Sequence, residues 1–356
     1  MMRRMLLYVM LLIVSPQIQA ADAAEAVEVS SVRATAETVA QPKADGVAIW
    51  INEHEPESSL VIGADPRRGL RTFDLGGQLR QNIQFEGGGA AEVDVRYGIE
   101  LASKPVALVA GAINKANLIY VYSVNPESGE LIDAQAEPVA TENDAYGSCL
   151  YHSQIDQKLY LFVTSKQGRI VQFELTVVAD GRILPRKVRQ FDLNPPDGDG
   201  VVEACAADDH HGWLYLCQEN HARVWRFQAE PDASDEKMLV LDAATRPTDN
   251  TEGVAIWDGG AGAGYLLVSI QSSWEYRVYD RVPDPVTNVY PLLGRFSLEY
   301  AGRQVESHDC IEVANVPFGS IFPGGLFVVQ DSAGATSPNY KLVDWSAVSA
   351  SLNLAP

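Results

Sequence analysis

The chain has 356 residues and a formal net charge of −20 at pH 7, with 47 acidic against 27 basic side chains. Such an excess of negative charge repels nucleic acid and anionic lipid surfaces, so we expect neither a nucleic acid nor a membrane as a partner. Hydrophobic residues make up 46% of the chain, and 28 glycines and 19 prolines are spread along it, which is typical of many short strands joined by tight turns.

Residues 1–20 have the order of a secretory signal peptide. Two arginines precede an apolar run over residues 5–14, and Ala20 supplies the small residue of a cleavage site. The run is short for a membrane span, although a retained N-terminal anchor is the alternative. We therefore expect a secreted or periplasmic protein that is cleaved near Ala20. Residues 21–44, rich in alanine, glutamate and valine, should form a flexible lead-in.

A short phrase occurs twice in the remaining chain. It reads D-G-V-A-I-W at 45–50 and E-G-V-A-I-W at 252–257, an acid followed by glycine and an apolar strand. Weaker copies head four further units, so that an acid opens each of six units of roughly fifty residues. The six opening acids are Asp45, Glu92, Asp144, Glu203, Glu252 and Asp309.

Each unit contains three or four short apolar strands separated by turn-rich bends. The second and third strands of successive units are expected at 60–62 and 70–74, 106–111 and 119–124, 159–164 and 170–175, 213–217 and 223–227, 265–270 and 277–279, and 326–330 and 341–345. The pattern predicts an all-β protein, a six-bladed β-propeller with four-stranded blades around a central channel, which forms a single domain over 45–350. A two-sheet sandwich is the alternative, but it would give no reason for an acid at the head of every unit.

In a propeller the first strand of each blade lines the channel, so acids that head these strands converge at one mouth. Carboxylates crowded together repel, and they either take up protons or bind a cation. Oxygen ligands without clustered histidine or cysteine favour Ca²⁺, which tolerates irregular coordination by six to eight oxygens. Acids that each cap their own turn and face water are the alternative. The expected metal ligands are Asp45, Glu203, Glu219, Glu252 and Asp309.

Basic residues are scarce, and several lie in the bends that follow second strands. Arg67 and Arg68 lie in the first unit, Lys115 in the second and Lys166 in the third, while Tyr146 follows the third opening acid. Blade geometry could bring them to one rim beside the acids, where cations and bound calcium would together attract phosphate esters. Solvated turn residues are the alternative for each.

The four cysteines have no C-x-x-C spacing, which excludes the usual zinc and redox motifs. Cys205 and Cys217 lie on the two arms of a predicted hairpin and could face each other, and an exported protein permits a disulfide. Buried free thiols are the alternative reading.

Longer phrases carry a family resemblance. They include V-D-V-R-Y at 93–97, Y-G-S-C-L-Y-H-S at 146–153, T-S-K-Q-G at 164–168, A-A-D-D at 206–209, F-Q-A-E-P at 227–231, T-E-G at 251–253, F-V-V-Q-D at 327–331 and N-Y-K-L-V-D-W at 339–345. In this order they resemble the β-propeller phytases, calcium-dependent six-bladed enzymes that remove phosphates from myo-inositol hexakisphosphate. The match runs from about Asp45 to Trp345.

The resemblance implies a phosphoric monoester hydrolase of the 3-phytase type, a monomer that acts on phytate or calcium-phytate through metal-activated water. It makes Glu203, Glu219, Glu252 and Asp309 calcium ligands around the cleavage site, and it assigns Asp45 to a structural calcium together with the stretch at 92–93. It further implies that Glu203, Tyr146 and Lys166 are catalytic, and that Lys115, Arg67 and Arg68 bind substrate with Tyr146 and Lys166.

The chain also departs from the family pattern. Gly46 and Val47 replace an aspartate and a proline, Lys115 replaces an arginine, and Gln218 and Asn250 replace acids. Losses of charge or oxygen lower calcium affinity. The chain is in this respect similar to the incomplete propeller domain of some two-domain phytases. The alternative function is therefore a weakly active or non-catalytic propeller that binds calcium and phosphorylated ligands.

Overall fold

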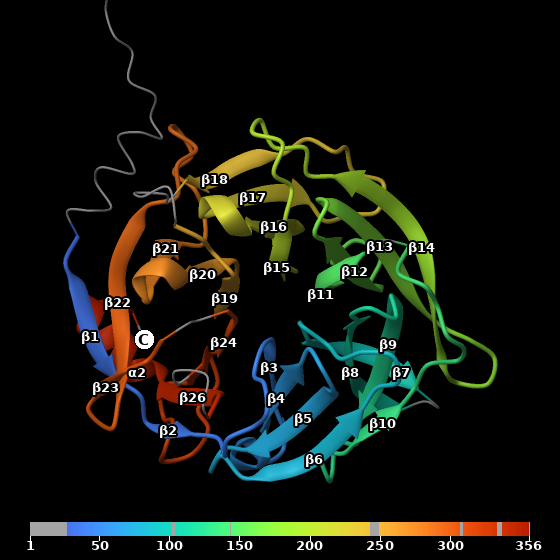
Figure 1. Cartoon of the computed structure of the whole chain (residues 1–356), viewed down its shortest axis with the longest axis horizontal. Coiled ribbons are helices and arrows are strands. Elements are labelled where there is room, and N and C mark those ends of the chain that lie inside the picture. The colour runs from blue at the N-terminus through green and yellow to red at the C-terminus, as the bar shows by residue number, and fades with distance from the viewer. Residues whose placement is uncertain are drawn as a thin grey trace, which may run out of the picture.

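The computed structural model describes residues 27–101, 104–142, 144–242, 249–306, 309–332 and 337–355. The expected signal peptide over 1–20 lies outside the described residues. Six separate sheets stand around a central channel, each with its first strand innermost (Figure 1). Within the described part of the chain, the helices are too short and too polar to cross a membrane.

The blades follow one another in chain order. The first two are β3 (Val47–Trp50), β4 (Leu60–Asp65), β5 (Gly69–Asp74) and β6 (Leu79–Gln84), then β7 (Asp94–Leu101), β8 (Lys104–Ile113), β9 (Leu118–Val124) and β10 (Leu131–Asp133). The next two are β11 (Ala145–His152), β12 (Leu159–Ser165), β13 (Arg169–Val177) and β14 (Ile183–Asp192), then β15 (Val202–Asp208), β16 (Trp213–Gln218), β17 (Arg223–Gln228) and β18 (Met238–Asp242).

The fifth blade adds two strands to its four, and the sixth is completed by a strand from the start of the chain. The fifth contains β19 (Gly253–Gly260), β20 (Ala263–Ile270), β21 (Glu275–Asp280) and β22 (Leu292–Tyr300), with β1 (Val29–Arg33) and β23 (Arg303–Gln304) on β22. The sixth contains β24 (Ile311–Ala314), β25 (Leu326–Asp331), β26 (Asn339–Asp344) and β2 (Ala36–Glu37). The predicted six-bladed propeller with four-stranded blades is confirmed, and the sandwich is excluded.

The second strand of each blade is buried on both faces because a neighbouring blade covers each side. β4, β12 and β25 are buried at every residue, which explains why each begins with a run of apolar residues instead of an alternating pattern. Leu161 and Phe173 of the third blade, for example, share a core cluster with Leu108 and Val121 of the second. Packing between blades therefore fixes the ring, and the ring fixes the ends of the innermost strands.

The flexible lead-in expected over 21–44 is wrong for its strand-forming part. β1 pairs in parallel with β22, and β2 pairs antiparallel with β26, so that the lead-in occupies sheet edges that would otherwise be unpaired. A buried ammonium secures this closure: Nζ of Lys341 lies 2.6 Å from a carboxylate oxygen of Glu37 in β2 and 2.9 Å from one of Asp331 in β25.

Among the residues that the structure describes, helical structure is limited to short segments. α2 (Trp345–Leu352) begins where the last expected strand was to end, and its buried Trp345 stacks on Trp257 of the fifth blade. Three single-turn 3₁₀ segments lie in bends: η1 (Pro56–Ser58), η2 (Glu219–His221) and η3 (Gln271–Ser273).

The pairing suggested for Cys205 and Cys217 does not form. The register of β15 and β16 sets Cys205 opposite Leu216, so the two cysteines belong to opposite faces of their sheet. Cys205 packs in the cluster between the third and fourth blades, and Cys217 in the cluster between the fourth and fifth. All four cysteines are free thiols, as the alternative reading expected.

Candidate active site at one mouth of the channel

The innermost strands all start at the same mouth of the channel, and the six opening acids stand at or just before their starts. Asp45 and Asp309 lie two residues before β3 and β24, and Glu252 lies directly before β19. Glu203 is the second residue of β15, while Glu219 opens η2 at the end of the neighbouring strand. The repeat thus builds the site, because the opening acids of five of the six blades line one cavity.

A cavity of about 470 Å³ occupies this mouth. Its described lining includes six carboxylates, three lysines and a tyrosine: Asp45, Asp144, Glu203, Glu219, Glu252, Asp309, Lys43, Lys115, Lys166 and Tyr146. All five expected metal ligands are brought together here. Glu92 lies deeper in the channel, where it accepts a hydrogen bond from the Cys310 thiol at 2.8 Å.

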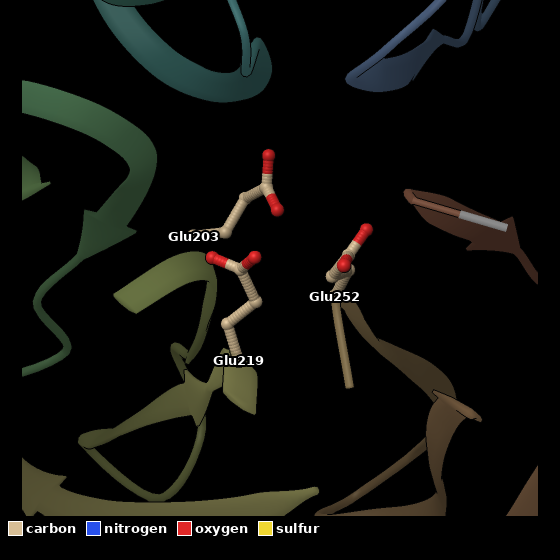
Figure 2. A group of neighbouring side chains, drawn as sticks. All are labelled: Glu203, Glu219 and Glu252. Atoms are coloured by element: carbon tan, nitrogen blue, oxygen red, sulfur yellow. The ribbon is translucent and has the colours of Figure 1, made fainter. Parts of the chain in front are cut away.

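Three of the carboxylates form a compact group. Oxygens of Glu203, Glu219 and Glu252 lie within 4.8 Å of one another (Figure 2). A calcium ion sits 2.3–2.6 Å from each of its oxygens, so two oxygens of one ion are up to about 5 Å apart. In Figure 2 the carboxylate of Glu219 is directed toward Glu203, and Glu252 enters from the next blade. The spacing therefore fits a single cation held by all three side chains.

A positive charge would stabilise the ionised form of these buried, neighbouring carboxylates. Burial, reinforced by the neighbouring acids, raises the pKa of Glu203 to about 8 and that of Glu252 to about 10. Burial also raises the pKa of Tyr146, whose hydroxyl hydrogen-bonds to Glu203. Crowded acids of this kind hold protons until a cation replaces them.

Asp45 gives an independent sign that the mouth fits a cation. Its side chain is 6% exposed, and its Oδ1 has no hydrogen-bond partner among the described residues. Burial, then repulsion from Glu203 and Asp309, raises its pKa well above the ordinary value. A buried carboxylate oxygen that lacks a donor is costly, and a cation would satisfy it.

Amide side chains hold the acids of the fifth and sixth blades. Nε2 of Gln271 donates to both Glu252 and Asp309, and Nδ2 of Asn250 donates to Glu252 at 2.7 Å. These amides orient the carboxylates without neutralising them. The site can therefore bind a cation through fixed oxygens.

The expected cations divide into two groups. Lys115 and Lys166 line the cavity, and Nζ of Lys166 lies 4.5 Å from the centre of the Tyr146 ring. Arg67 and Arg68 do not line it, since both are exposed in the turn between β4 and β5, and Pro66 reaches the cavity instead. The structure thus brings together two of the four expected basic residues.

These observations can be set beside known proteins. The family model described as "Phytase" matches residues 3–356. The 3-phytase of Bacillus subtilis (strain 168) is 33% identical over 329 residues, which cover 88% of this chain and 82% of that protein. The chain belongs to the phytase family. Its resemblance to that family is confirmed, and with it the expectation of a phosphoric monoester hydrolase of the 3-phytase type.

A solved structure outside the phytase family shares the fold. The calcium-binding protein regucalcin from Agrobacterium tumefaciens str. C58 aligns with a TM-score of 0.52 at 11% identity, covering 88% of this chain and 95% of the other. At that identity the likeness concerns the propeller alone.

Three polar lining residues of this phytase-family site escaped the sequence reasoning: Lys43, Asn114 and Gln271. Gln271 occupies the bend after the second strand of its blade, the position that singled out Lys115 and Lys166, so the same rule applied to amides would have found it. Lys43 lies two residues before Asp45, within the segment expected to be a flexible lead-in.

Proposed function

We propose that the chain is a calcium-dependent phytase that hydrolyses phosphate monoesters of myo-inositol hexakisphosphate. The observation that carries this proposal is the compact group of Glu203, Glu219 and Glu252, which lies in one cavity with Tyr146 and Lys166 in a chain of the phytase family. Bound calcium supplies charge that neutralises phosphoryl oxygens and acidifies its water.

The residues of the chain then have separable tasks. Lys166 and Lys115 bind phosphoryl oxygens at the rim, and Tyr146 fixes the position of Lys166 through its ring. Glu203 accepts the proton of the attacking water as the new oxygen–phosphorus bond forms and the bond to the inositol oxygen breaks. Without metal, the pKa of about 8 means that the Glu203 carboxyl holds a proton near neutral pH. A bound cation would displace that proton and leave a carboxylate that can act as the base.

A second candidate function, a weakly active or non-catalytic binder of calcium and phosphorylated ligands, has one structural observation in its favour. A Cβ at Gly46, where the family has an aspartate, would lie 2.4 Å from the Ala91 carbonyl oxygen and 2.7 Å from Oε2 of Glu92. The backbone here has closed over the space that the lost ligand would need. This observation favours weaker metal binding near Asp45.

Phosphate release from phytate, measured with added calcium and then with chelator, decides between the two functions. We expect release that depends on calcium and stops in chelator. A protein that binds calcium but releases no phosphate would be the non-catalytic binder.

We also propose that the chain is exported, on the strength of the N-terminal pattern over 1–20. The N-terminus of protein recovered from outside the cytoplasm should begin close to residue 21. Recovery of the uncleaved chain in the membrane fraction would support the retained anchor instead.

A further inference from the structure

Lys43 is a cation fixed at the edge of the acidic mouth. The backbone on both sides of it is anchored, because the amide of Gln41 donates to the Pro338 carbonyl at 2.9 Å and the amide of Asp45 donates to the Ala64 carbonyl at 3.1 Å. Ala44, between Lys43 and Asp45, is fully buried. The side chain of Lys43 therefore starts from a fixed point and lines the cavity.

Its ammonium is attracted to Asp309 without being locked to it. Nζ of Lys43 lies 3.9 Å from Oδ2 of Asp309, beyond hydrogen-bond length, and 37% of the side chain is exposed. The contrast is Lys341, whose side chain is 1% exposed and whose Nζ lies within 2.9 Å of oxygens from Glu37, Asn339 and Asp331. Lys341 is a structural cation, whereas Lys43 stands where a diffusible cation could stand.

The carboxylates of the mouth come from two pairs of neighbouring blades, and Gln271 links the two pairs by donating to both Glu252 and Asp309. Glu203, Glu219 and Glu252 come from the fourth and fifth blades and are close enough to share one ion. Asp309 opens the sixth blade and Asp45 opens the first, and these two blades are neighbours where the ring closes. Lys43 lies on the Asp45 and Asp309 side of the mouth, with its Nζ facing Asp309.

We propose that Lys43 serves as a built-in cation at Asp309, so that it excludes a further calcium ion from the space between Asp309 and Asp45 and confines calcium to Glu203, Glu219 and Glu252. A diffusible divalent ion and a tethered ammonium beside the same carboxylate would repel each other, because like charges in a partly buried site are poorly screened. The backbone closed over Gly46 leaves the same side with fewer ligands for an ion. The proposal rests on the proposed function only for the identity of the ion.

Counting the calcium ions bound to the metal-free protein tests this assignment. Equilibrium dialysis with calcium should show one more ion per chain in Lys43→Ala than in the wild type, and the same number in Lys43→Arg as in the wild type. Lys158→Ala is the matched control, since Lys158 is a half-exposed lysine in the turn between β11 and β12 that also pairs with carboxylates. It should leave the count unchanged.

Two further arms show where the extra ion lies. The double variant Lys43→Ala/Asp309→Asn should return to the wild-type count, and Lys43→Gln should behave as Lys43→Ala if the latter folds poorly. In chelator the melting temperature of Lys43→Ala should fall below that of the wild type, and saturating calcium should close the gap. Equal calcium counts in the wild type and both neutral variants would overturn the inference.

The outcome is distinguishable from a failure of the proposed function. If the wild type releases no phosphate from phytate while Lys43→Ala gains an ion, the function is wrong and the built-in cation stands. If the wild type is an active phytase and the ion count does not respond to Lys43, the built-in cation alone is wrong.

Discussion

The two ends of the channel use the same residue types in opposite ways. At the far end, Arg281 donates two hydrogen bonds of 2.8 Å to Asp208, and Arg96 pairs with both Asp94 and Asp209. At the site mouth the described lining includes lysines but no arginine. Asp208 and Glu203 lie on the same strand, β15, about 16 Å apart at about 3.3 Å per residue.

The acids at the two ends of the channel differ in the charged side chains that surround them. Burial raises the pKa of both acids, but Arg281 lowers that of Asp208 below its ordinary value, while burial together with the neighbouring carboxylates raises that of Glu203 to about 8. Acids that stabilise the propeller are matched with a charge during folding. Glu203, Glu219 and Glu252 at the mouth are left for a ligand to match, which is how a single repeat supplies both a scaffold and a site.

The largest expected effect is a loss of catalysis from a substitution at the site mouth, where the carboxylates lack an arginine partner. Glu203→Gln keeps the shape of the side chain but removes a charge from the calcium group and the acceptor for the proton of water. We expect phosphate release to fall about 10²–10⁴-fold, with native circular dichroism. Asp45→Asn is the comparison variant: because Asp45 lies outside the group that holds calcium in this account, the change should leave saturated turnover largely intact. Unchanged turnover in Glu203→Gln would remove Glu203 from the mechanism.

At the far end of the channel, where arginines pair with the acids, we expect substitutions to change stability instead of turnover. Arg281→Met leaves Asp208 buried without its cation, and breaking a buried pair in this way costs about 3–5 kcal/mol of unfolding free energy. Denaturant unfolding should show that loss, while turnover per folded molecule stays at the wild-type level. A stable Arg281→Met protein, or one that is folded and inactive, would break the contrast between the two ends.

The stability of the metal-free protein should depend on pH, because the pKa of Glu203 at the site mouth is raised. Glu203 titrates near the ordinary value of 4.5 when unfolded and at about 8 when folded, so the folded state holds more protons between these values. Its contribution to stability is therefore present below about pH 4.5 and is lost as the pH rises toward about 8. In chelator we expect the melting temperature to fall over this window, less steeply in Glu203→Gln. A wild-type curve as flat as that of the variant would contradict the raised pKa.

The smallest expected effect is on the unfolding free energy, from a substitution at an exposed partner of Arg281. Asp258 also pairs with Arg281, at 2.7 Å, but its side chain is 61% exposed. Because exposed ion pairs contribute little, Asp258→Asn should change the unfolding free energy by less than about 1 kcal/mol. A loss comparable to that of Arg281→Met would mean that the arginine depends on both partners equally.

The features that recur in every repeat unit could be predicted from the sequence. Apolar strands and an acid at a constant position define the blades, and the closed ring then brings Glu203, Glu252 and Asp309 to one mouth. Glu219 could be placed as well, because it ends a strand of a recognised unit. These features are local in sequence and need only the propeller geometry to become three-dimensional.

Features that depend on register or on distant partners could not be predicted in this way. A one-residue offset in pairing turns Cys205 and Cys217 to opposite faces, and the direction of a tight turn sends Arg67 and Arg68 to solvent. The strands β1 and β2 form because β22 and β26, from the other end of the chain, supply the edges on which they pair. The position of Lys43 depends on the same long-range pairing.

Calorimetric titration of the metal-free protein with calcium at pH 7, in two buffers of different ionisation enthalpy, tests the central claim most directly. If the unmatched carboxylates hold the ion, binding must displace protons from Glu203 and Glu252, whose pKa values of about 8 and about 10 leave them protonated beforehand. We predict calcium binding with buffer-dependent heats that reveal proton release, and loss of this binding in the folded triple variant Glu203→Gln/Glu219→Gln/Glu252→Gln. Calcium binding of the same affinity in the triple variant, without proton release in the wild type, would contradict the account.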